Sequence, residues 1–333
     1  MHCVHLCRRK SKTTRKSQDR AVTNHAAAVR EGIRTVDVDN HCDFSGSSDL
    51  CICIVTWNMN GQVSYEDIEE LVGRDRRYDL LVVGLQEAPR RNISRLLQAA
   101  LAQTHSLLGK AILQSVQLYV FGPKKSELFI KELKKDKYGV GGCGGLVRRK
   151  KGAVAIRISY QGIRLEFISC HLSAHARNVE ERNSEFREIT KSLFSKDWNP
   201  YGRPPDITVW LGDLNYRLQG INTFPARSLI HDNLLELLSS KDQLLQEAER
   251  GQIFNGYCEG ALAFKPTYKF DIGSNSYDTS HKVRVPSWTD RILFKIEDLE
   301  KINAALHSYE SIDTIHSSDH RPVKAHLCLK VNK

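Results

Sequence analysis

The chain has 333 residues, is 41% hydrophobic and carries a formal net charge of +10. This length and composition are typical of a folded protein with one large domain or two ordinary ones. They argue against an integral membrane protein, because no run of about 18 apolar residues occurs, and the N-terminus lacks the apolar stretch of a secretory signal. The positive charge favours anionic partners such as nucleic acid, phospholipid or phosphorylated small molecules, and equally serves solubility.

Residues 1–49 differ in pattern from the rest of the chain. They show no sustained period of two or 3.6, and the first twenty residues carry seven basic groups and one acid. We therefore expect a basic, disordered tail over 1–49, followed by one domain over 50–333. Cys3 and Cys7 lie beside basic residues and are candidates for lipidation, although incidental cysteines in an unstructured tail are the favoured interpretation.

The nine cysteines are an odd number and form no closely spaced Cys-x-x-Cys pairs. Cys51 and Cys53 alternate within an apolar strand pattern, and Cys170 and Cys328 lie in similar runs. A zinc site or a disulfide framework is therefore not expected, and a reducing, cytoplasmic location is favoured.

From residue 51 onward, strand-like and helical patterns follow one another. Apolar runs predict strands, in chain order, at 51–57, 79–85, 111–121, 153–159, 164–170, 206–211, 291–296 and 323–329. Capping residues and helical spacing predict helices beginning near Ser64 and over 92–105, 177–196 and 233–250. Several strands follow one another without a helix between them, so a purely parallel sheet fits poorly. Two packed mixed sheets with outer helices fit better.

Polar side chains lie just beyond the ends of four predicted strands. They are Asn58, Glu87, Asp213 with Asn215, and Asp319 with His320. Any one of them is an ordinary turn residue by itself, but all four in one chain favour a site at the edge of a sheet. Carboxylate and amide oxygens are hard ligands, so this donor set predicts Mg²⁺ rather than zinc.

Two segments are much more specific, Val-Trp-Leu-Gly-Asp-Leu-Asn-Tyr-Arg-Leu at 209–218 and Arg-Val-Pro-Ser-Trp-Thr-Asp-Arg-Ile-Leu at 284–293. Here the chain resembles the inositol polyphosphate 5-phosphatase family, in particular its small, single-domain, plant-like members. The resemblance extends over residues 51–330. That family belongs to the endonuclease/exonuclease/phosphatase superfamily, so the resemblance implies a four-layer α/β/β/α sandwich of two mixed β-sheets flanked by helices.

The resemblance also implies roles for the polar residues. Glu87 is similar to the main Mg²⁺ carboxylate of the family, with Asn58 and Asp319 near the metal. Asp213 resembles the residue that orients or deprotonates the attacking water, and Asn215 the amide that holds the phosphoryl group. The remaining catalytic positions are the phosphate-contacting histidines His171 and His320 and the carboxylate of Asp290, which orients His320.

Substrate binding is expected from basic residues, because Lys and Arg form charge-assisted hydrogen bonds with phosphate. The resemblance implies that the inositol 4-phosphate is held by Tyr268, Lys269, Lys282 and Arg284. Lys150 and Lys151 occupy positions that the family uses near the 1-phosphate, but the chain has Lys-Lys-Gly-Ala where the usual pattern is Asn-Lys-Gly-Gly. A solvated strand end is an equally good interpretation of these two lysines.

Residues 124–151 carry ten Lys or Arg against three Asp or Glu. We interpret the lysine-rich part as a helix with basic and apolar sides, close to the mouth of the site, that binds an anionic membrane. Packing of its apolar residues on the core is the alternative. The glycine-rich run 139–145 contains a GxGxxG spelling, but it precedes a strand rather than a helix, so a dinucleotide site is rejected.

The function predicted from these features is Mg²⁺-dependent removal of the 5-phosphate from phosphoinositides such as phosphatidylinositol 4,5-bisphosphate, and as further candidates from soluble inositol polyphosphates. We expect a monomer that associates peripherally with membranes. A Mg²⁺-dependent nuclease of the same superfamily is the alternative enzyme, but no nucleic-acid-binding signature occurs, so nucleic acid is not expected as a partner. An inactive phosphoinositide-binding module is the other alternative, and the complete set of catalytic residues argues against it.

Overall fold

The computed structural model describes residues 32–39, 42, 49–73, 77–89, 92–140, 151–197 and 203–332. Two β-sheets form its centre. The seven-stranded sheet comprises, in spatial order, β1 (Arg34–Val36), β10 (Cys258–Gly260), β11 (Asp290–Ile296), β9 (Ile207–Asp213), β8 (Ile163–His171), β7 (Gly152–Tyr160) and β6 (Ile130–Gly139). The six-stranded sheet comprises β12 (Ile302–Ser311), β13 (Val323–Val331), β2 (Asp49–Asn58), β3 (Leu80–Gln86), β5 (Val116–Pro123) and β4 (His105–Leu113).

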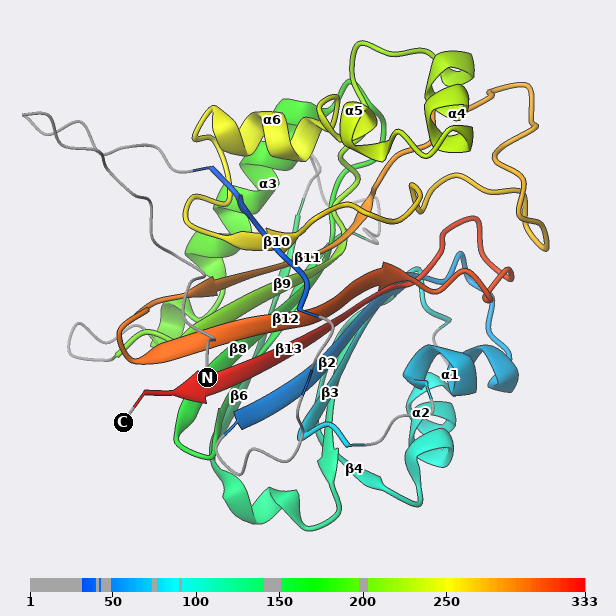
Figure 1. Cartoon of the computed structure of the whole chain (residues 1–333). Helices are drawn as coiled ribbons and strands as arrows, with labels where there is room; N and C mark the ends of the chain where they lie inside the picture. The colour runs from blue at the N-terminus through cyan, green and yellow to red at the C-terminus, as the bar shows by residue number, and fades with distance from the viewer. Residues whose placement is uncertain are drawn as a thin grey trace, which may run out of the picture.

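Helices cover the outer faces of both sheets, so the molecule has four layers (Figure 1). One helical layer contains α1 (Tyr65–Val72) and α2 (Ile93–Leu101). The other contains α3 (Val179–Ser192), α4 (Thr223–His231), α5 (Leu235–Ser239) and α6 (Gln243–Glu249). Each sheet has both parallel and antiparallel neighbours, for example β8–β9 and β9–β11. The predicted α/β/β/α sandwich of two mixed sheets is confirmed, and none of the described helices is long and apolar enough to span a membrane.

The alternation of side chains along β2 shows how one strand serves two cores. Ile52 and Ile54 lie in the central core between the sheets, whereas Cys53 and Val55 pack in the outer core under α1 and α2. Successive side chains of a strand point to opposite faces, and because both faces are covered here, residues 50–55 of the strand are all apolar.

Local signals explain where several helices begin. Ser64 Oγ accepts a hydrogen bond from the backbone N–H of Asp67 at 3.0 Å, so it caps α1 as the sequence predicted. Asp242 Oδ1 caps α6 in the same way, through the N–H of Leu245 at 3.1 Å. The helix predicted over 233–250 is in fact two, α5 and α6, separated by a turn at residues 240–242.

Four predictions for the remaining segments were wrong. The strand predicted at 111–121 is the hairpin β4–β5, which turns at Gln114, a residue with φ of 54°. The lysine-rich part of 124–151 is not a helix but a short 3₁₀ turn, η1 (Ser126–Phe129), followed by strand β6 at a sheet edge. Within 1–49, Arg34–Val36 forms β1 and pairs in parallel with β10. Cys51 and Cys328, expected as thiols, form a disulfide between β2 and β13.

Candidate active site

The ends of five strands bring the predicted polar residues together. Asn58 is the last residue of β2 and lies opposite Gln86, the last residue of the parallel strand β3, so Glu87 follows next to it. In the other sheet, the ends of β8 and β9 place His171 opposite Asp213. Strand β11 runs antiparallel to β9 and therefore starts at the same edge, with Asp290 opposite Asp213. The two sheets together supply one cluster.

Asp213 is at the centre of this cluster and is almost completely buried. Its Oδ2 accepts a hydrogen bond from Asn58 Nδ2 at 2.9 Å and lies 3.2 Å from His171 Nε2. Its Oδ1 accepts the backbone N–H of Asn215 at 3.0 Å. Burial raises the pKa of Asp213, but the hydrogen bond from His171 and the charges of His171, His320 and Lys151 outweigh it and hold the pKa well below its usual range. The carboxylate is therefore ionised at neutral pH.

His171 and Lys151 form the second part of the cluster. Lys151 Nζ is in hydrogen-bond contact with His171 Nε2, and Glu87 Oε1 lies 4.0 Å from the same nitrogen. Burial lowers the pKa of His171, and the positive charge of Lys151 lowers it further, against the opposing effect of Asp213. Burial also lowers the pKa of Lys151. Both shifts favour the uncharged forms of the two side chains.

His320 is the opposite case. Its Nδ1 lies 2.9 Å from Asp290 Oδ2, and its Nε2 lies 4.0 Å from Asp213 Oδ2. Burial lowers the pKa of His320, but the charge of Asp290 and the hydrogen bond to it outweigh burial and raise the pKa to about 9, with further help from Asp213 and Asp319. His320 is therefore a buried imidazolium at neutral pH.

Two residues of the site have a left-handed backbone, Glu87 with φ of 49° and Asn215 with φ of 58°. This conformation is uncommon for residues other than glycine and tends to occur where a side chain must be held in a functional direction. The Glu87 side chain is 41% exposed beside the buried Asp213. An exposed carboxylate in a strained backbone, next to buried polar groups, is available for a ligand.

A cavity of about 240 Å³ adjoins the cluster. Tyr268, Lys282 and Arg284 line it, as does Arg217. The Tyr268 ring packs against the His320 ring, with centroids 4.5 Å apart and planes tilted by 38°, which connects the cavity to the catalytic cluster. Lys269 follows Tyr268, and its Nζ lies 3.9 Å from Asp278 Oδ1. The four residues predicted to bind one phosphate thus lie in one region beside His320.

Of the two lysines predicted to lie near the 1-phosphate, the structure describes only one. Lys150 lies outside the described residues. Lys151 is described, and it contacts His171 rather than lining the cavity of Lys282 and Arg284.

Comparison with known proteins identifies the family of this chain. A family model described as Endonuclease/Exonuclease/phosphatase family 2 matches residues 55–326. Type IV inositol polyphosphate 5-phosphatase 11 of Arabidopsis thaliana is 64% identical over 304 residues, which cover 91% of this chain and 90% of that protein. The chain belongs to the inositol polyphosphate 5-phosphatase family.

Two further relatives show how widely this 5-phosphatase domain is shared. Phosphatidylinositol 4,5-bisphosphate 5-phosphatase A of Mus musculus is 32% identical, over 84% of this chain but only 31% of that longer protein. The crystal structure of the inositol polyphosphate 5-phosphatase domain of SPsynaptojanin, in complex with inositol (1,4)-bisphosphate and calcium ion, matches with a TM-score of 0.73 and 30% identity, covering 85% of this chain and 86% of that one.

A buried ion-pair network supports the 5-phosphatase signature segment at 284–293. The guanidinium of Arg291 binds both carboxylate oxygens of Glu259 at 2.6 Å and Asp242 Oδ1 at 2.9 Å. All three side chains are buried, so loss of Arg291 would leave two carboxylates without a cation in the interior. The network holds the start of β11, and with it Asp290, against α6 and β10.

Sequence reasoning missed Arg217 as a residue of the site. Its guanidinium donates to Asn215 Oδ1 and stacks over the Tyr268 ring at 4.2 Å from the centroid. The signal was its place two residues after Asn215 in the first signature segment. Thr267 and Thr289 were also missed, although their hydroxyl groups donate to Asp290 Oδ2 at 2.7 and 2.8 Å.

Proposed function

We propose that this 5-phosphatase family member hydrolyses the 5-phosphate of phosphoinositides, such as phosphatidylinositol 4,5-bisphosphate, in a Mg²⁺-dependent reaction, with soluble inositol polyphosphates as further substrates. The observation that carries the proposal is the pairing of an ionised Asp213 with an imidazolium His320, whose Oδ2 and Nε2 atoms lie 4.0 Å apart. An anion that orients water and a cation that faces a phosphoryl group are the two functions that a phosphomonoesterase requires.

Asp213 is assigned to the attacking water. A carboxylate with a low pKa is a weak base, so its main contribution is to orient the water, which transfers its proton as the bond to phosphorus forms. The three donors on Asp213 hold the carboxylate in one orientation, and its burial excludes competing waters. Asn215 is assigned to the phosphoryl group, because an amide donates to phosphate without repelling it.

His320 and Asp290 are assigned to the charge that develops on the phosphoryl oxygens. The Asp290–His320 hydrogen bond fixes Nδ1 as a donor and leaves Nε2–H available for the substrate. His171, with Lys151 beside it, provides a second phosphate contact. Neither histidine has to act as a nucleophile. Cys170 does not either, because its thiol is fully buried and burial raises its pKa well above the usual value.

The donor atoms around Glu87 fit a hard divalent cation. Glu87, Asn58 and Asp319 offer carboxylate and amide oxygens, which suit Mg²⁺. The exposed Glu87 side chain is the main ligand in this proposal, and when bound, Mg²⁺ polarises a phosphoryl oxygen and neutralises charge. Asp213, Asp290 and His320 also lie close enough together to share an ion, but Asp290 and His320 already bind each other, so we assign the metal to the oxygen donors.

The cavity beside His320 is assigned to the inositol ring and its 4-phosphate. Lys282 and Arg284 bring positive charge to its wall, and Lys269 is close by. Arg217 extends this charge toward Asn215. Basic groups on one side of the reacting phosphate bind an inositol that carries a further phosphate better than a simple monoester.

Membrane contact is assigned to the rim of this cavity. Phe224, in the first turn of α4, is 78% exposed, and Thr223 beside it donates to the carbonyl oxygen of Val283 in the cavity wall. Figure 1 shows α4 and the 261–289 loops at the same end of the molecule. An exposed aromatic residue beside basic residues is typical of peripheral membrane binding. We place the enzyme on the cytoplasmic side of such a membrane.

The described residues of the segment 124–151, our candidate for membrane binding from the sequence, extend between two ends of the molecule, and residues 141–150 lie outside the described residues. Gly139, at one end of β6, lies opposite Gly152, which in turn lies opposite His171 of the site. Ile130, at the other end, is nine residues away, or about 30 Å along a strand. The exposed Leu128 and Phe129 precede Ile130 and so lie far from the cavity rim. We therefore assign membrane contact to the cavity rim and not to the part near Lys124 and Lys125.

The test is phosphate release from a panel of lipid and soluble inositol phosphates, with and without a 5-phosphate, at several Mg²⁺ concentrations. We expect release only from substrates with a 5-phosphate and only with a divalent cation. Plasmid DNA is assayed in parallel, because nicking without phosphate release would favour the nuclease. Binding of phosphoinositide without turnover would favour an inactive binding module.

A further inference from the structure

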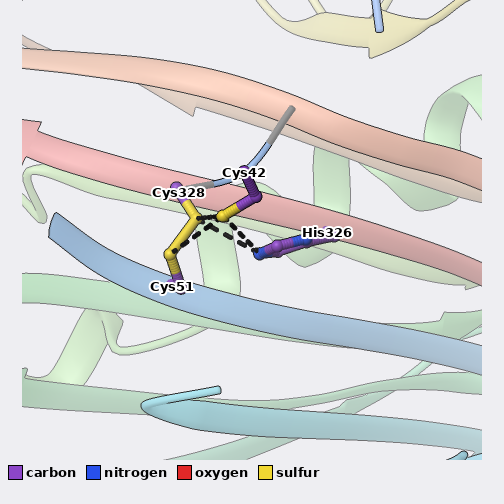
Figure 2. Close-up of side chains that lie close together, drawn as sticks. All are labelled: Cys42, Cys51, His326 and Cys328. Atoms are coloured by element: carbon purple, nitrogen blue, oxygen red, sulfur yellow. Dashed lines mark hydrogen bonds between the residues drawn. A yellow bond between two sulfur atoms is a disulfide. The ribbon is translucent and has the colours of Figure 1, made fainter. Parts of the chain in front are cut away.

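A cluster of sulfur and nitrogen atoms lies on two interior strands of the six-stranded sheet, β2 and β13, near the strand ends that are away from the active site. In the antiparallel pair β2–β13, Cys51 lies directly opposite Cys328. His326 is two residues before Cys328 and therefore on the same face of the sheet. Cys42, from the segment that precedes β2, lies over these three residues (Figure 2). The four side chains are therefore neighbours in the fold, although Cys42 and Cys328 are 286 residues apart in sequence.

The distances in this cluster are close to those of a tetrahedral metal site. Cys42 Sγ lies 3.9 Å from Cys51 Sγ, 3.5 Å from Cys328 Sγ and 3.7 Å from His326 Nε2, and Cys328 Sγ lies 3.2 Å from His326 Nε2. Around tetrahedral zinc, with Zn–S bonds of about 2.3 Å and Zn–N bonds of about 2.0 Å, neighbouring ligand atoms are about 3.5 to 3.8 Å apart. The remaining sulfur pair, Cys51 and Cys328, forms a disulfide.

We propose that Cys42, Cys51, Cys328 and His326 bind one Zn²⁺ ion when the Cys51–Cys328 disulfide is reduced. Three thiolates and one imidazole are the ligands of a closed structural zinc site. These soft donors differ from the oxygen donors around Glu87. Zn²⁺ therefore binds preferentially to the cysteines and Mg²⁺ to the oxygen donors of the active site. Zinc and the disulfide exclude each other, because a sulfur atom in a disulfide is not a thiolate.

The surroundings of the cluster hold its ligands in place. The backbone N–H of Cys51 donates to Asp79 Oδ2 at 2.8 Å. The His326 ring packs edge-on against Tyr78, with centroids 4.8 Å apart, and near His307 at 5.1 Å. His307 is itself fixed by the carbonyl oxygen of Asp39, 2.6 Å from its Nδ1. Cys51, Cys328 and His326 are all buried. Packing of this kind orients metal ligands before the metal binds.

A simple structural disulfide accounts for less of the cluster. A cross-strand disulfide needs only Cys51 and Cys328, whereas here a third thiol and an imidazole nitrogen lie within 4 Å of the same sulfur, Cys328 Sγ. Cys42 also brings in the segment before β2, so a metal bound here joins that segment to the sheet. A metal that links distant segments contributes its binding free energy to folding.

The two states are connected by a balanced exchange. A dithiol donates two electrons and two protons, the Cys51–Cys328 sulfur–sulfur bond breaks, two thiols form, and the dithiol becomes a disulfide. Zn²⁺ then replaces the three thiol protons of Cys42, Cys51 and Cys328, which are released to solvent, as three Zn–S bonds and one Zn–N bond form. Cys51 lies seven residues before Asn58 on β2, about 23 Å from the active site. The metal therefore acts on stability and not on the phosphatase chemistry.

The experiment uses the full chain, reduced with a phosphine, freed of transition metals and kept in excess Mg²⁺ so that the oxygen donors are occupied. Co²⁺ is titrated as the probe, because a thiolate-to-cobalt charge-transfer band reports cysteine ligation. Zn²⁺ is then added to displace it. We expect one tightly bound cobalt per chain, complete displacement by zinc, and a higher thermal unfolding midpoint with zinc than without.

Cys42→Ser and His326→Gln each remove one ligand and leave the strands intact. We expect each to weaken cobalt affinity by at least about a hundredfold, with activity on a soluble inositol phosphate unchanged. Cys258→Ser, which removes a half-buried cysteine of β10, is the matched control and keeps full affinity. The proposal is overturned if the reduced chain shows no thiolate band, if Cys42→Ser binds cobalt as tightly as the unaltered chain, or if the oxidised chain binds it equally well.

Discussion

His320 Nδ1 lies 2.9 Å from Asp290 Oδ2, and both side chains are buried beside the cavity of the active site. This contact keeps a histidine charged in the interior, where burial alone would keep it neutral. The protonation state of His320 thus depends chiefly on one carboxylate, Asp290, which touches no substrate in the proposed mechanism. The two residues give the enzyme a pH dependence that can be measured.

The first prediction follows from this pair. The pKa of His320 is raised from 6.5 to about 9, so the imidazolium persists at neutral pH and is lost as pH rises through about 9. Activity that depends on the imidazolium should fall above that pH. Asp290→Asn removes the charge that raises the pKa, so the alkaline fall in kcat/KM should move to lower pH. The measurement is kcat/KM against pH on a soluble substrate.

The same pair affects stability with a defined sign. A raised pKa in the folded state stabilises it below the unfolded pKa of about 6.5, and this contribution is lost as pH rises toward 9. Asp290→Asn should flatten the dependence of unfolding free energy on pH in that window. Asp232→Asn is the matched control, because Asp232 forms an exposed pair with His231 at 3.0 Å and should leave both profiles unchanged. If the alkaline fall in kcat/KM of Asp290→Asn occurred at the same pH as in the unaltered enzyme, Asp290 would not be the group that keeps His320 charged.

The second prediction compares two aspartates at opposite ends of β9, Asp213 in the site and Asp206 outside it. Asp213→Asn keeps the size of the side chain but removes the charge that orients the water, so kcat should fall by at least about a hundredfold. Asp206, just before β9, binds Arg164 at 2.7 Å and Lys301 at 3.0 Å and is remote from the site. Asp206→Asn should lower the thermal midpoint and leave kcat nearly unchanged. A folded Asp213→Asn protein with normal kcat would refute the role of Asp213.

The third prediction concerns the metal. Glu87→Gln replaces the exposed carboxylate with a neutral amide of the same shape. Because an amide is a weaker ligand for Mg²⁺ than a carboxylate, the Mg²⁺ concentration for half-maximal activity should rise by at least about tenfold. A titration of activity against Mg²⁺ measures it. Glu300→Gln is the control, because Glu300 is exposed just before β12, at the end of the sheet where Ile302 pairs with Val331 and opposite the site. It should not change the requirement, and an unchanged requirement in Glu87→Gln would place the metal elsewhere.

The fourth prediction concerns specificity for the 4-phosphate. Lys269→Ala removes a positive charge beside the cavity, so kcat/KM should fall by about tenfold or more for substrates with a 4-phosphate and much less for those without it. The backbone N–H groups of Arg284 and Ser280 also donate to Asp278, the partner of Lys269. These hydrogen bonds do not involve the Lys269 side chain, so the cavity wall should remain in place in Lys269→Ala. Lys295→Ala, in β11, is the control. Equal losses on both substrates would argue against this role.

The fifth prediction compares two exposed apolar side chains. Phe224 is 78% exposed at the cavity rim, and Leu128 is 80% exposed at the far end of β6. Phe224→Asp should reduce binding to anionic liposomes and turnover of lipid substrate, because an aromatic anchor is replaced by a charge that the membrane repels. Leu128→Asp should change neither. Turnover of a short-chain soluble substrate should be the same in both variants, and a liposome defect in Leu128→Asp alone would reverse our assignment.

The sequence by itself determined the family, the sandwich and most of the cluster. Ser64 was recognisable as a helix cap because capping depends on neighbours in sequence. Asn58, Glu87 and Asp213 were recognisable because each follows an apolar strand, and strand ends meet at sheet edges. Local chemistry and spacing are sufficient for features of this kind.

Only the tertiary structure decided the features that depend on distant partners. The lysine-rich run at 130–139 became strand β6 because it pairs with β7, and its charge pattern alone is compatible with a helix or an edge strand. Arg217 entered the site because Tyr268 lies under its guanidinium. Cys51 and Cys328 are 277 residues apart, and they meet because the register of β2 and β13 places them opposite each other. Strand register is set by packing of the whole sheet, so no short stretch of sequence contains it.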